Sequence, residues 1–390
     1  MIKNKKAILL ISHELDIHGA SKMLIQIIES LQEEYDIHVL VPGSGKINQI
    51  LDKKKCHVIS KKFYLDVEPK SDKAWNKVIW YIRVIRYYLF RKRINNKVIN
   101  EVSKYVVENN IVLVHSNSSS ISIGLDIAKK NRIKHVWHFR EFLAEDFNLH
   151  PLIGWENYLK KASQSEAIIC VSKSIYQKYA NIINAPIYLI YDGIKDKNIE
   201  IKKKNHNGLN LFQAGVLSIG KGTDIAVKAV NKLINEGYNI HLYLAGNGNL
   251  DFCQDIYDSV KSHIHLLGFV DDIDYIKNKL EIDIELVCSK SEGFGLVTVE
   301  AMRSHNPVIG SNSAGTSELI KDGYNGYLFD LGSVDDLVKK INIFREYPEK
   351  IEIMGENGYK RFKELFTSDR NIYEIKKIYR NMLEDNRRGK

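Results

Sequence analysis

The sequence has few cysteines and no long apolar run, and each absence excludes a class of protein. No stretch approaches the roughly 20 apolar residues of a membrane-spanning helix, and the start, MIKNKKAILLIS, has too few apolar residues for a signal peptide. Scattered thiols are typical of reduced core cysteines and not of a disulfide framework or a zinc site. We therefore expect a protein that stays in the cytoplasm. The cysteines are Cys56, Cys170, Cys253 and Cys288.

Two common nucleotide-binding motifs are also missing. The segment VPGSGKIN (41–48) resembles a phosphate loop, but Leu40 stands where the first glycine is required. Ile47 stands where the loop needs a magnesium-binding hydroxyl. No G-x-G-x-x-G follows the first apolar run, which argues against a dinucleotide-dependent oxidoreductase.

The candidate metal ligands lack the neighbouring ligand residues that would complete a metal site. Asp272 and Asp274 form an Asp-x-Asp, but they open a helix-compatible stretch, where acids serve as caps and dipole partners. We favour that role over metal binding and expect neither a metal nor a cofactor. Two histidine pairs have no carboxylate or cysteine that would complete a site, namely His135 with His138 and His263 with His265.

Length and charge bound the organisation of the chain. A chain of 390 residues is too long for one ordinary core, which predicts two domains. Hydrophobic residues make up 44% and charged residues 27% of the sequence, as in soluble globular proteins. The formal net charge of +9 favours an anionic partner or surface.

Short apolar runs alternate with longer amphipathic ones in the first half. The segment from Lys22 to Glu33 places its apolar residues on one helical face. Apolar runs separated by such segments predict buried parallel strands and an α/β fold with right-handed crossovers. The predicted strands cover residues 7–11, 38–41, 112–116, 135–139, 167–172 and 187–193.

The second half restarts the same alternation after a charged segment, 196–208, which has no periodicity and is predicted to be a linker. In doubly wound sheets, ligands bind beyond the carboxyl ends of the strands, so two facing domains would share a cleft. The predicted strands of this half cover residues 209–215, 240–246, 264–270, 282–289 and 306–311.

Two glutamates inside SKSEGFGLVTVEAM are the most informative feature of the chain. Glu292 precedes a Gly-Phe-Gly turn, and a helix-compatible run over 296–302 carries Glu300. A turn that leads into a helix presents backbone N–H groups and the positive end of the helix dipole, which suits a phosphate. A carboxylate on that helix can accept hydrogen bonds from paired hydroxyls, such as a ribose diol. The motif therefore predicts a sugar-nucleotide site.

The segments around this motif occur in the order found in a known family. QAGVLSIGKGTD carries Lys221 and Gly222, and LYLAGNGN, LLGFVDD and PVIGSNSAGTSELIKDGYNGYLF accompany the glutamate motif. From about residue 208 to its end, the chain resembles the retaining nucleotide-sugar glycosyltransferases of the GT-B architecture called group 1, a glycosyltransferase family 4-like set. The resemblance implies two Rossmann-like domains that face each other across a cleft. It also implies a C-terminal helix that crosses back to the first domain.

The first half matches this family more loosely. HGASKML keeps Gly19 of a glycine-rich first loop, with Ala20 in place of a second glycine. VWHFRE places His138 where the family commonly has an active-site histidine. Two departures concern the phosphate site: Val216 stands near the position where many members have a second cation, and Ala314 replaces the first glycine of a later pair.

The resemblance implies transfer of a sugar from a nucleoside diphosphate, with retention at the anomeric carbon and without a metal. Lys221 would neutralise the leaving diphosphate, Glu300 would bind the ribose, and Glu292 would bind the donor sugar or the region of the reacting carbon. The predicted catalytic residues are His138, Glu292 and Lys221. The predicted donor-binding residues are Gly19, Lys221, Gly222, Glu292, Gly293, Phe294, Gly295, Leu296, Glu300 and Gly315.

Each of these residues also has an ordinary structural interpretation. Lys221 could be a solvated lysine in a turn, Glu300 a solvent-facing helix residue, and the glycines could serve turn geometry alone. His138 could be a core histidine with its hydrogen bonds satisfied. Arg140 and Glu141 could meet the acceptor or form a surface ion pair.

The segment 73–100 indicates where the acceptor lies. It contains eight basic residues, no acidic residue, and aromatic side chains among the cations. This composition favours a helix that lies on an anionic membrane. Two alternatives stay open: the apolar residues pack on the first domain, or, least favoured, the aromatic rings stack on nucleic acid.

These inferences combine into one predicted function. We expect a bacterial glycosyltransferase that uses a UDP-sugar and a lipid-linked or oligosaccharide acceptor at the inner face of the membrane, in polysaccharide synthesis, with no nucleic-acid partner. The alternatives are a sugar-nucleotide epimerase of the same fold and a non-catalytic partner protein. The implied domains are an acceptor-binding domain (1–195), a nucleotide-sugar-binding domain (208–367) and a returning helix (368–390).

Overall fold

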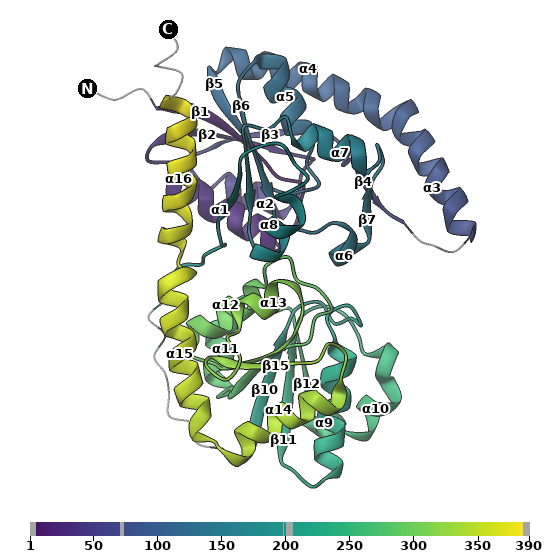
Figure 1. Ribbon diagram of the computed structural model, residues 1–390, viewed down its shortest axis with the longest axis vertical. Coiled ribbons are helices and arrows are strands. Elements are labelled where there is room, and N and C mark those ends of the chain that lie inside the picture. Colours follow the sequence, from purple (N-terminus) through teal and green to yellow (C-terminus); the bar gives the residue numbers. More distant parts are fainter. Residues whose placement is uncertain (1–4, 71–73, 198, 200–205, 385–390) are drawn as a thin grey trace. The chain divides into compact units, whose positions relative to one another are not determined.

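The structure, a computed structural model, describes residues 5–70, 74–197, 199 and 206–384, and of residues 74–77 it describes only the backbone. This part of the chain forms two compact units (Figure 1). Unit 1 extends to Tyr191 and resumes at Asn371, and unit 2 covers Asp192–Arg370. Much of the predicted linker lies outside the described residues, as do Lys73 and the side chains of Trp75 and Lys77.

In the described part of unit 1, a seven-stranded parallel sheet follows the order β3-β2-β1-β5-β6-β8-β9. The chain therefore builds one side of the sheet outward from β1 and then crosses back to build the other side from β5. Doubly wound sheets bind ligands where this order reverses, here at the carboxyl ends of β1 and β5. The strands are β1 (Lys6–Ile11), β2 (Tyr35–Val41), β3 (His57–Ser60), β5 (Ile111–Ser116), β6 (Lys134–Phe139), β8 (Ala167–Cys170) and β9 (Ile187–Leu189).

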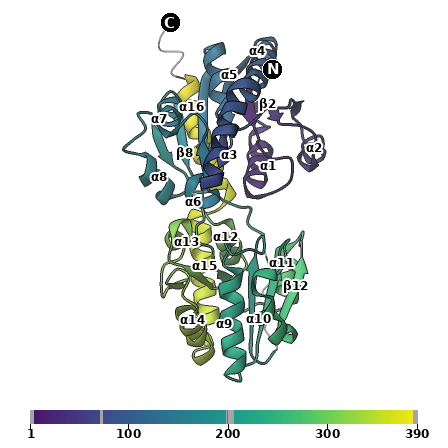
Figure 2. The ribbon, with the colours of Figure 1, turned by 90° about the vertical axis from the view of Figure 1, so that its right-hand side faces the viewer.

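Helices cover both faces of this sheet because β1 is apolar on both faces (Figures 1 and 2). Ile8 and Leu10 share a core with α1, α2 and α16. Ala7, Leu9 and Ile11 share a second core with α4 and α5. The helices are α1 (Gly19–Leu31), α2 (Lys46–Leu51), α4 (Lys92–Glu108), α5 (Ile123–Asn131), α7 (Trp155–Ala162), α8 (Lys173–Tyr179) and α16 (Ser368–Glu384).

A helical rod runs along one side of unit 1. It consists of α3 (Ala74–Arg86), the π-helical turn η1 (Tyr87–Arg91) and α4, which follow one another without a break (Figure 1). A short antiparallel pair, β4 (Val67–Pro69) with β7 (Leu149–Pro151), and the one-turn helix α6 (Ala144–Phe147) complete the elements of this unit that the structure describes.

The described residues of unit 2 contain a six-stranded parallel sheet in the order β12-β11-β10-β13-β14-β15. This order is that of the dinucleotide-binding folds, and it reverses between β10 and β13. The strands are β10 (Leu209–Ala214), β11 (Ile240–Ala245), β12 (Ile264–Gly268), β13 (Ile284–Val287), β14 (Val308–Ser311) and β15 (Gly326–Phe329).

Unit 2 also buries both faces of its sheet. Leu211 of β10 lies in a core with α9 and α14, whereas its neighbour Phe212 lies in a second core with α11. The helices are α9 (Thr223–Asn235), α10 (Gln254–Ser259), α11 (Ile273–Lys279), α12 (Leu296–Arg303), α13 (Ala314–Leu319), α14 (Val334–Glu346) and α15 (Glu349–Leu365).

The predicted α/β fold with parallel sheets in two domains is confirmed. The sequence analysis missed β3, β4, β7 and β15, which have only three or four residues each. The parallel strand expected over 187–193 forms, but only as the short β9, and its expected burial was wrong because Tyr188 and Leu189 are exposed at the edge of the sheet. The helix expected from Lys22 begins three residues earlier, at Gly19, and ends at Leu31.

Unit 2 contains a buried ion pair that joins a helix to its sheet. Nζ of Lys277, on α11, lies 2.5 Å from Oε2 of Glu285, on β13, and both side chains are at most 2% exposed. Burial raises the pKa of Glu285 to about 7, against the opposing effect of Lys277. Each charge is therefore stable in this core only because the other is present.

Replacement of Lys277 by methionine should lower the free energy of unfolding of unit 2 by about 3–5 kcal/mol at pH 8, because Glu285 loses its buried cation. The double variant Lys277→Met with Glu285→Leu should recover most of this loss, since no charge remains in the core. Urea denaturation followed by circular dichroism measures both effects. A single variant as stable as the wild type would contradict this prediction.

Candidate active site

The loop that follows β10 holds Lys221 beyond the carboxyl end of that strand. The N–H of Lys221 donates to the carbonyl of Ser218 at 3.1 Å. The carbonyl of Lys221 accepts a hydrogen bond from Nε2 of the buried Gln213 at 2.8 Å. These contacts fix the backbone of Lys221 between β10 and the start of α9.

The loop that follows β13 brings Glu292 to Lys221. Nζ of Lys221 lies 2.7 Å from Oε1 of Glu292, and the same oxygen accepts from Oγ of Ser289 at 2.6 Å. The Lys221 side chain is 34% exposed and that of Glu292 is 15% exposed. Lys221 is therefore not the solvated turn lysine of the alternative interpretation. The pair lies where the strand order of unit 2 reverses, which is the expected ligand position in this fold.

Backbone hydrogen bonds hold the Glu292 loop between its two neighbouring loops. On one side, the N–H of Lys290 donates to the carbonyl of Gly220 at 3.0 Å. On the other side, Oγ of Ser313 donates to the carbonyl of Lys290 at 2.8 Å, and the N–H of Gly315 donates to the carbonyl of Glu292 at 3.0 Å. The loops after β10, β13 and β14 therefore form one connected structure.

Two of the predicted glycines are required by close backbone approach. Gly222 caps α9 in the left-handed region with φ of 65°, and a Cβ there would lie 2.0 Å from the carbonyl oxygen of Cys288. A Cβ on Gly315 would lie 2.4 Å from the carbonyl oxygen of Phe294. Gly315 was predicted to bind the donor, but its N–H already donates to the carbonyl of Glu292 and is not free to bind a phosphate. This glycine instead lets the loops pack together.

The start of α12 follows the Glu292 loop directly. Gly295 caps the helix with φ of 102°, a conformation that favours glycine, and the half-buried Gly293 and Leu296 lie on either side. The first N–H groups of a helix have no intrahelical acceptor, which suits an anion. The ring of Phe294 is only 4% exposed and packs edge-on against Phe366, so it belongs to the core.

Glu300 lies in the second turn of α12 and is half-buried. Within the part of the chain that the structure describes, its carboxylate makes no hydrogen bond and no ion pair. A partly buried carboxylate without a partner has lost hydration that ligand hydroxyls can replace. Glu300 therefore remains available to a ligand, whereas Oε1 of Glu292 already contacts Lys221 and Ser289.

The Asp-x-Asp of the sequence has a structural role. Oδ1 of Asp272 accepts from the N–H of Tyr275 and caps α11, which confirms the expected cap. Asp274 is buried and pairs with Arg303 at 2.6 Å and with Lys197 at 2.7 Å. Burial alone would raise the pKa of Asp274, but hydrogen bonds from these two cations lower this pKa to about 2. Both of its oxygens are engaged within the protein.

Gly19 of unit 1 is the first residue of α1. The carboxylate of Glu14 already binds a backbone N–H group at the start of this helix. Oε2 of Glu14 accepts from the N–H of Ser21 at 2.8 Å, and Oε1 of Glu14 lies 3.3 Å from Nδ1 of His18. A carboxylate at a helix N-terminus satisfies both the N–H groups and the dipole. A phosphate at Gly19 would have to displace Glu14.

His138, on β6, is fully buried in a polar network. Its Nδ1 lies 3.2 Å from Nε2 of His115 and 3.3 Å from Nη2 of Arg140. Its Nε2 is buried without a hydrogen-bond partner among the described residues, so the interpretation as a satisfied core histidine holds for one nitrogen only. Burial, together with Arg140 and His115, lowers the pKa of His138 well below 6.5 and keeps the ring neutral at pH 7.

The sequence analysis missed the polar residues that follow β5. Nδ2 of Asn117 donates to the carbonyl of Ala20 at 2.9 Å, and its Oδ1 accepts from Nε of Arg140 at 3.0 Å. Asn117 therefore links the start of α1 to the His138 network. Arg140 is only 7% exposed, so the alternative of a surface ion pair is wrong. The signal in the sequence was NSSS directly after a predicted strand, at its ligand-binding end.

Glu141 is held by two of these serines. Oγ of Ser118 and the N–H of Ser119 both donate to Oε2 of Glu141 at 3.0 Å. Desolvation raises the pKa of Glu141 despite these hydrogen bonds. The end of β6 therefore carries a second group of preorganised polar atoms, in unit 1.

The helical rod of unit 1 exposes a set of large apolar side chains. These side chains are 37–68% exposed, so the alternative in which they pack on the first domain is wrong for them. Trp80 instead contacts His150 edge-on, and Tyr87 is buried. The exposed set is Val78, Ile79, Tyr81, Ile82, Ile85, Tyr88, Leu89, Phe90 and Ile94.

Cations lie between these apolar residues in the sequence, but not all of the cations are exposed. Arg83 and Arg91 both pair with Glu68 of β4, whereas Arg86 and Arg93 are exposed. Across the helices that the structure describes, none combines the length and apolar character needed to span a bilayer. The rod therefore carries both large apolar side chains and cations that are exposed.

Two family models match this chain. The model for glycosyl transferases group 1 matches residues 194–361, and the model for glycosyltransferase family 4 matches residues 17–197. The two matches overlap at residues 194–197, near the boundary between the units, and together reach from residue 17 to residue 361.

Named relatives agree with these models. An uncharacterised glycosyltransferase of Methanocaldococcus jannaschii, MJ1178, is 29% identical over 285 residues, which are 72% of this chain and 78% of that protein. The capsular polysaccharide biosynthesis glycosyltransferase CapM of Staphylococcus aureus is 24% identical over 197 residues, 48% of this chain and 51% of CapM.

A solved structure shares the fold over nearly the whole chain. Alr3699/HepE of Anabaena, in complex with UDP, superimposes with a TM-score of 0.76 at 17% sequence identity. The match covers 96% of this chain and 100% of the Anabaena chain. The same Anabaena protein has also been solved with UDP-glucose. The two matching models, the relatives and the shared fold lead to one conclusion: this chain belongs to the group 1 glycosyltransferases of the GT-B fold.

Proposed function

We propose that the chain transfers a sugar from a UDP-sugar, with retention at the anomeric carbon and without a metal at the donor. The observation that carries this proposal is the contact between Lys221 and Glu292 in the loops after β10 and β13, with Glu300 on α12, the helix that follows the second of these loops. One cation is held in place by Glu292, and Glu300 has no partner among the described residues. Such a set can receive a diphosphate, a sugar and a ribose together.

The choice of UDP is supported by the complexes of Alr3699/HepE with UDP and UDP-glucose. Charge in the transition state develops mostly on the leaving diphosphate, so the protein must supply cations and N–H donors. In our proposal Lys221 and the N-terminus of α12 do so. Val216 is 57% exposed and offers no second cation to share this role.

We further propose that the acceptor is a lipid-linked glycan or oligosaccharide at the inner face of the membrane, in synthesis of a cell-surface polysaccharide. The name of CapM supports this class of product. The exposed apolar side chains of α3 and η1 support attachment to a bilayer, and the exposed cations beside them favour anionic lipid. In this proposal the chain is a peripheral membrane protein on the cytoplasmic side of the membrane.

Replacement of Glu300 by alanine should weaken UDP binding by about tenfold or more, because charge-assisted hydrogen bonds to the ribose contribute about 1.5–3 kcal/mol each. Isothermal titration calorimetry measures this change. UDP that lacks both ribose hydroxyls should bind the wild type and Glu300→Ala with equal, weak affinity. If the variant binds intact UDP as tightly as the wild type, the assignment of Glu300 is wrong.

Replacement of Lys221 by alanine should lower kcat by about 100-fold to 1,000-fold, as expected when one preorganised group that stabilises a developing anion is lost. Turnover by the wild type should survive EDTA, since no metal is proposed at the donor. Release of UDP together with the glycosylated product measures both effects. Loss of activity in EDTA and its restoration by manganese would contradict the metal-free mechanism.

The nature of the product also tests the reaction class. Retention requires an α-linked product from an α-linked donor, which proton NMR of the product reports. Isomerisation of the donor without transfer would indicate the epimerase instead. Tight UDP binding without any turnover would indicate a non-catalytic protein.

Membrane attachment should be visible in liposome flotation as binding to phosphatidylglycerol vesicles that weakens with salt. Each cation near an anionic surface contributes about 1 kcal/mol. We therefore expect the triple variant Arg86→Glu, Lys92→Glu, Arg93→Glu to release the protein. Arg91 is left unchanged because it pairs with Glu68.

Matched control variants test whether membrane binding depends on this surface or only on the net charge of the protein. Reversal of three exposed cations outside the rod, Lys22, Lys53 and Lys55, should leave flotation largely unchanged. The double variant Ile82→Ser, Phe90→Ser should weaken the part of the binding that salt does not remove. Equal flotation of all variants, or none for the wild type, would exclude the proposed membrane surface.

A further inference from the structure

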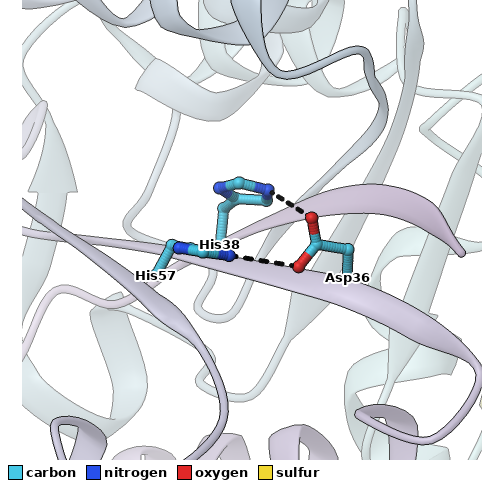
Figure 3. A group of neighbouring side chains, drawn as sticks. All are labelled: Asp36, His38 and His57. Carbon is cyan, nitrogen blue, oxygen red and sulfur yellow. Dashed lines mark ion pairs between the residues drawn. The ribbon is translucent and has the colours of Figure 1, made fainter.

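A cluster of two histidines and an aspartate lies near the edge of the sheet of unit 1. Asp36 and His38 are two residues apart on β2 and therefore share one face of the sheet. His57, on the edge strand β3, is the residue paired in register with His38 (Figure 3). Nε2 of His38 lies 3.3 Å from Oδ2 of Asp36, and Nε2 of His57 lies 3.3 Å from Oδ1.

His38 is oriented as a metal ligand would be. Its side chain is 1% exposed, and its Nε2 is buried without a hydrogen bond of acceptable geometry to any described residue. Nδ1 lies 2.8 Å from the hydroxyl of Tyr105, on α4. An Nδ1–H that donates to this hydroxyl leaves the lone pair on Nε2, which faces Asp36. A hydrogen bond at the far ring nitrogen is the usual support of a ligating histidine.

The spacing of the three groups suits a tetrahedral ion. The candidate ligand atoms all lie within 4.8 Å of one another. Zn²⁺ with nitrogen and oxygen ligands at about 2.0–2.2 Å places neighbouring ligand atoms about 3.3–3.6 Å apart. The two rings are stacked with centroids 4.7 Å apart, so one must turn before both lone pairs meet at one point. His57 is 60% exposed and is free to turn.

We propose that Asp36, His38 and His57 bind one Zn²⁺ ion, which joins the edge strand β3 to β2, with water as the remaining ligand. Two imidazoles and a carboxylate with an open position form a donor set that zinc accepts. The neighbouring Cys56 takes no part, because its thiol donates to the carbonyl of Leu51.

This proposal departs from the expectation that the chain binds no metal. His57 is far from Asp36 and His38 in the sequence, and only the pairing of β2 with β3 brings the three together. The proposed site is also independent of the proposed sugar transfer. Its ligands belong to unit 1, whereas Lys221 and Glu292 belong to unit 2.

Zinc binding can be measured on the untagged, metal-free, full-length protein by isothermal titration calorimetry with Zn²⁺. We expect one ion per chain, and an affinity at least tenfold lower for His57→Gln and for Asp36→Asn. The matched control is His18→Gln, because His18 has a similarly exposed ring, 65% against 60%. This control should bind Zn²⁺ as the wild type does.

Two further readouts separate a site from a loss of folding. Both variants change exposed side chains, so their melting temperatures without metal should match that of the wild type. Zn²⁺ should then raise the melting temperature of the wild type and of His18→Gln, but not that of His57→Gln. Binding of Zn²⁺ that is the same in the wild type and His57→Gln, or no binding in the micromolar range, would reduce the cluster to an ordinary ion pair.

Discussion

The contact between Lys221 and Glu292 is the one on which the geometry of the donor-side site depends. It joins loops that follow β10 and β13, which are far apart in sequence but adjacent in the sheet. The loops can approach because residue 222 is a glycine, since a Cβ there would meet the carbonyl of Cys288. Glu292 in turn holds the cation before any ligand arrives, which is the preorganisation that stabilisation of a developing anion requires.

Four carboxylates of unit 2 illustrate how the neighbouring side chains determine the role of a carboxylate. Asp274 has two cations and a pKa of about 2, and Glu285 is buried with a pKa raised to about 7. Both stabilise the fold around α11. Glu292 shares its oxygen between Lys221 and a serine, and Glu300 has no partner among the described residues. Asp274 and Glu285 are each paired with a buried cation and hold the protein together, whereas a carboxylate with neither an ion pair nor a hydrogen bond is suited to a ligand.

Unit 1 combines a polar interior at the end of its central strands with an apolar exterior on its helical rod. The interior is not a simple core: His138 is neutral, and one of its ring nitrogens has no hydrogen-bond partner among the residues that the structure describes, so it can offer a hydrogen bond but not a positive charge. The exterior is not a simple surface either, because large apolar side chains are rarely left exposed together without a partner. Both features depart from the rule of apolar inside and polar outside, and both are therefore candidates for function.

The sequence by itself determined the alternating α/β fold, because short apolar runs flanked by amphipathic segments have few other ways to be buried on both faces. It also determined the glutamate motif and Lys221, whose residue types suit a nucleotide sugar. Only the tertiary structure decided which groups meet. The pairing of Lys221 with Glu292, the engaged N–H of Gly315 and the grouping of His57 with Asp36 all join separate segments. Such contacts depend on strand order and register, which no local pattern of residues encodes.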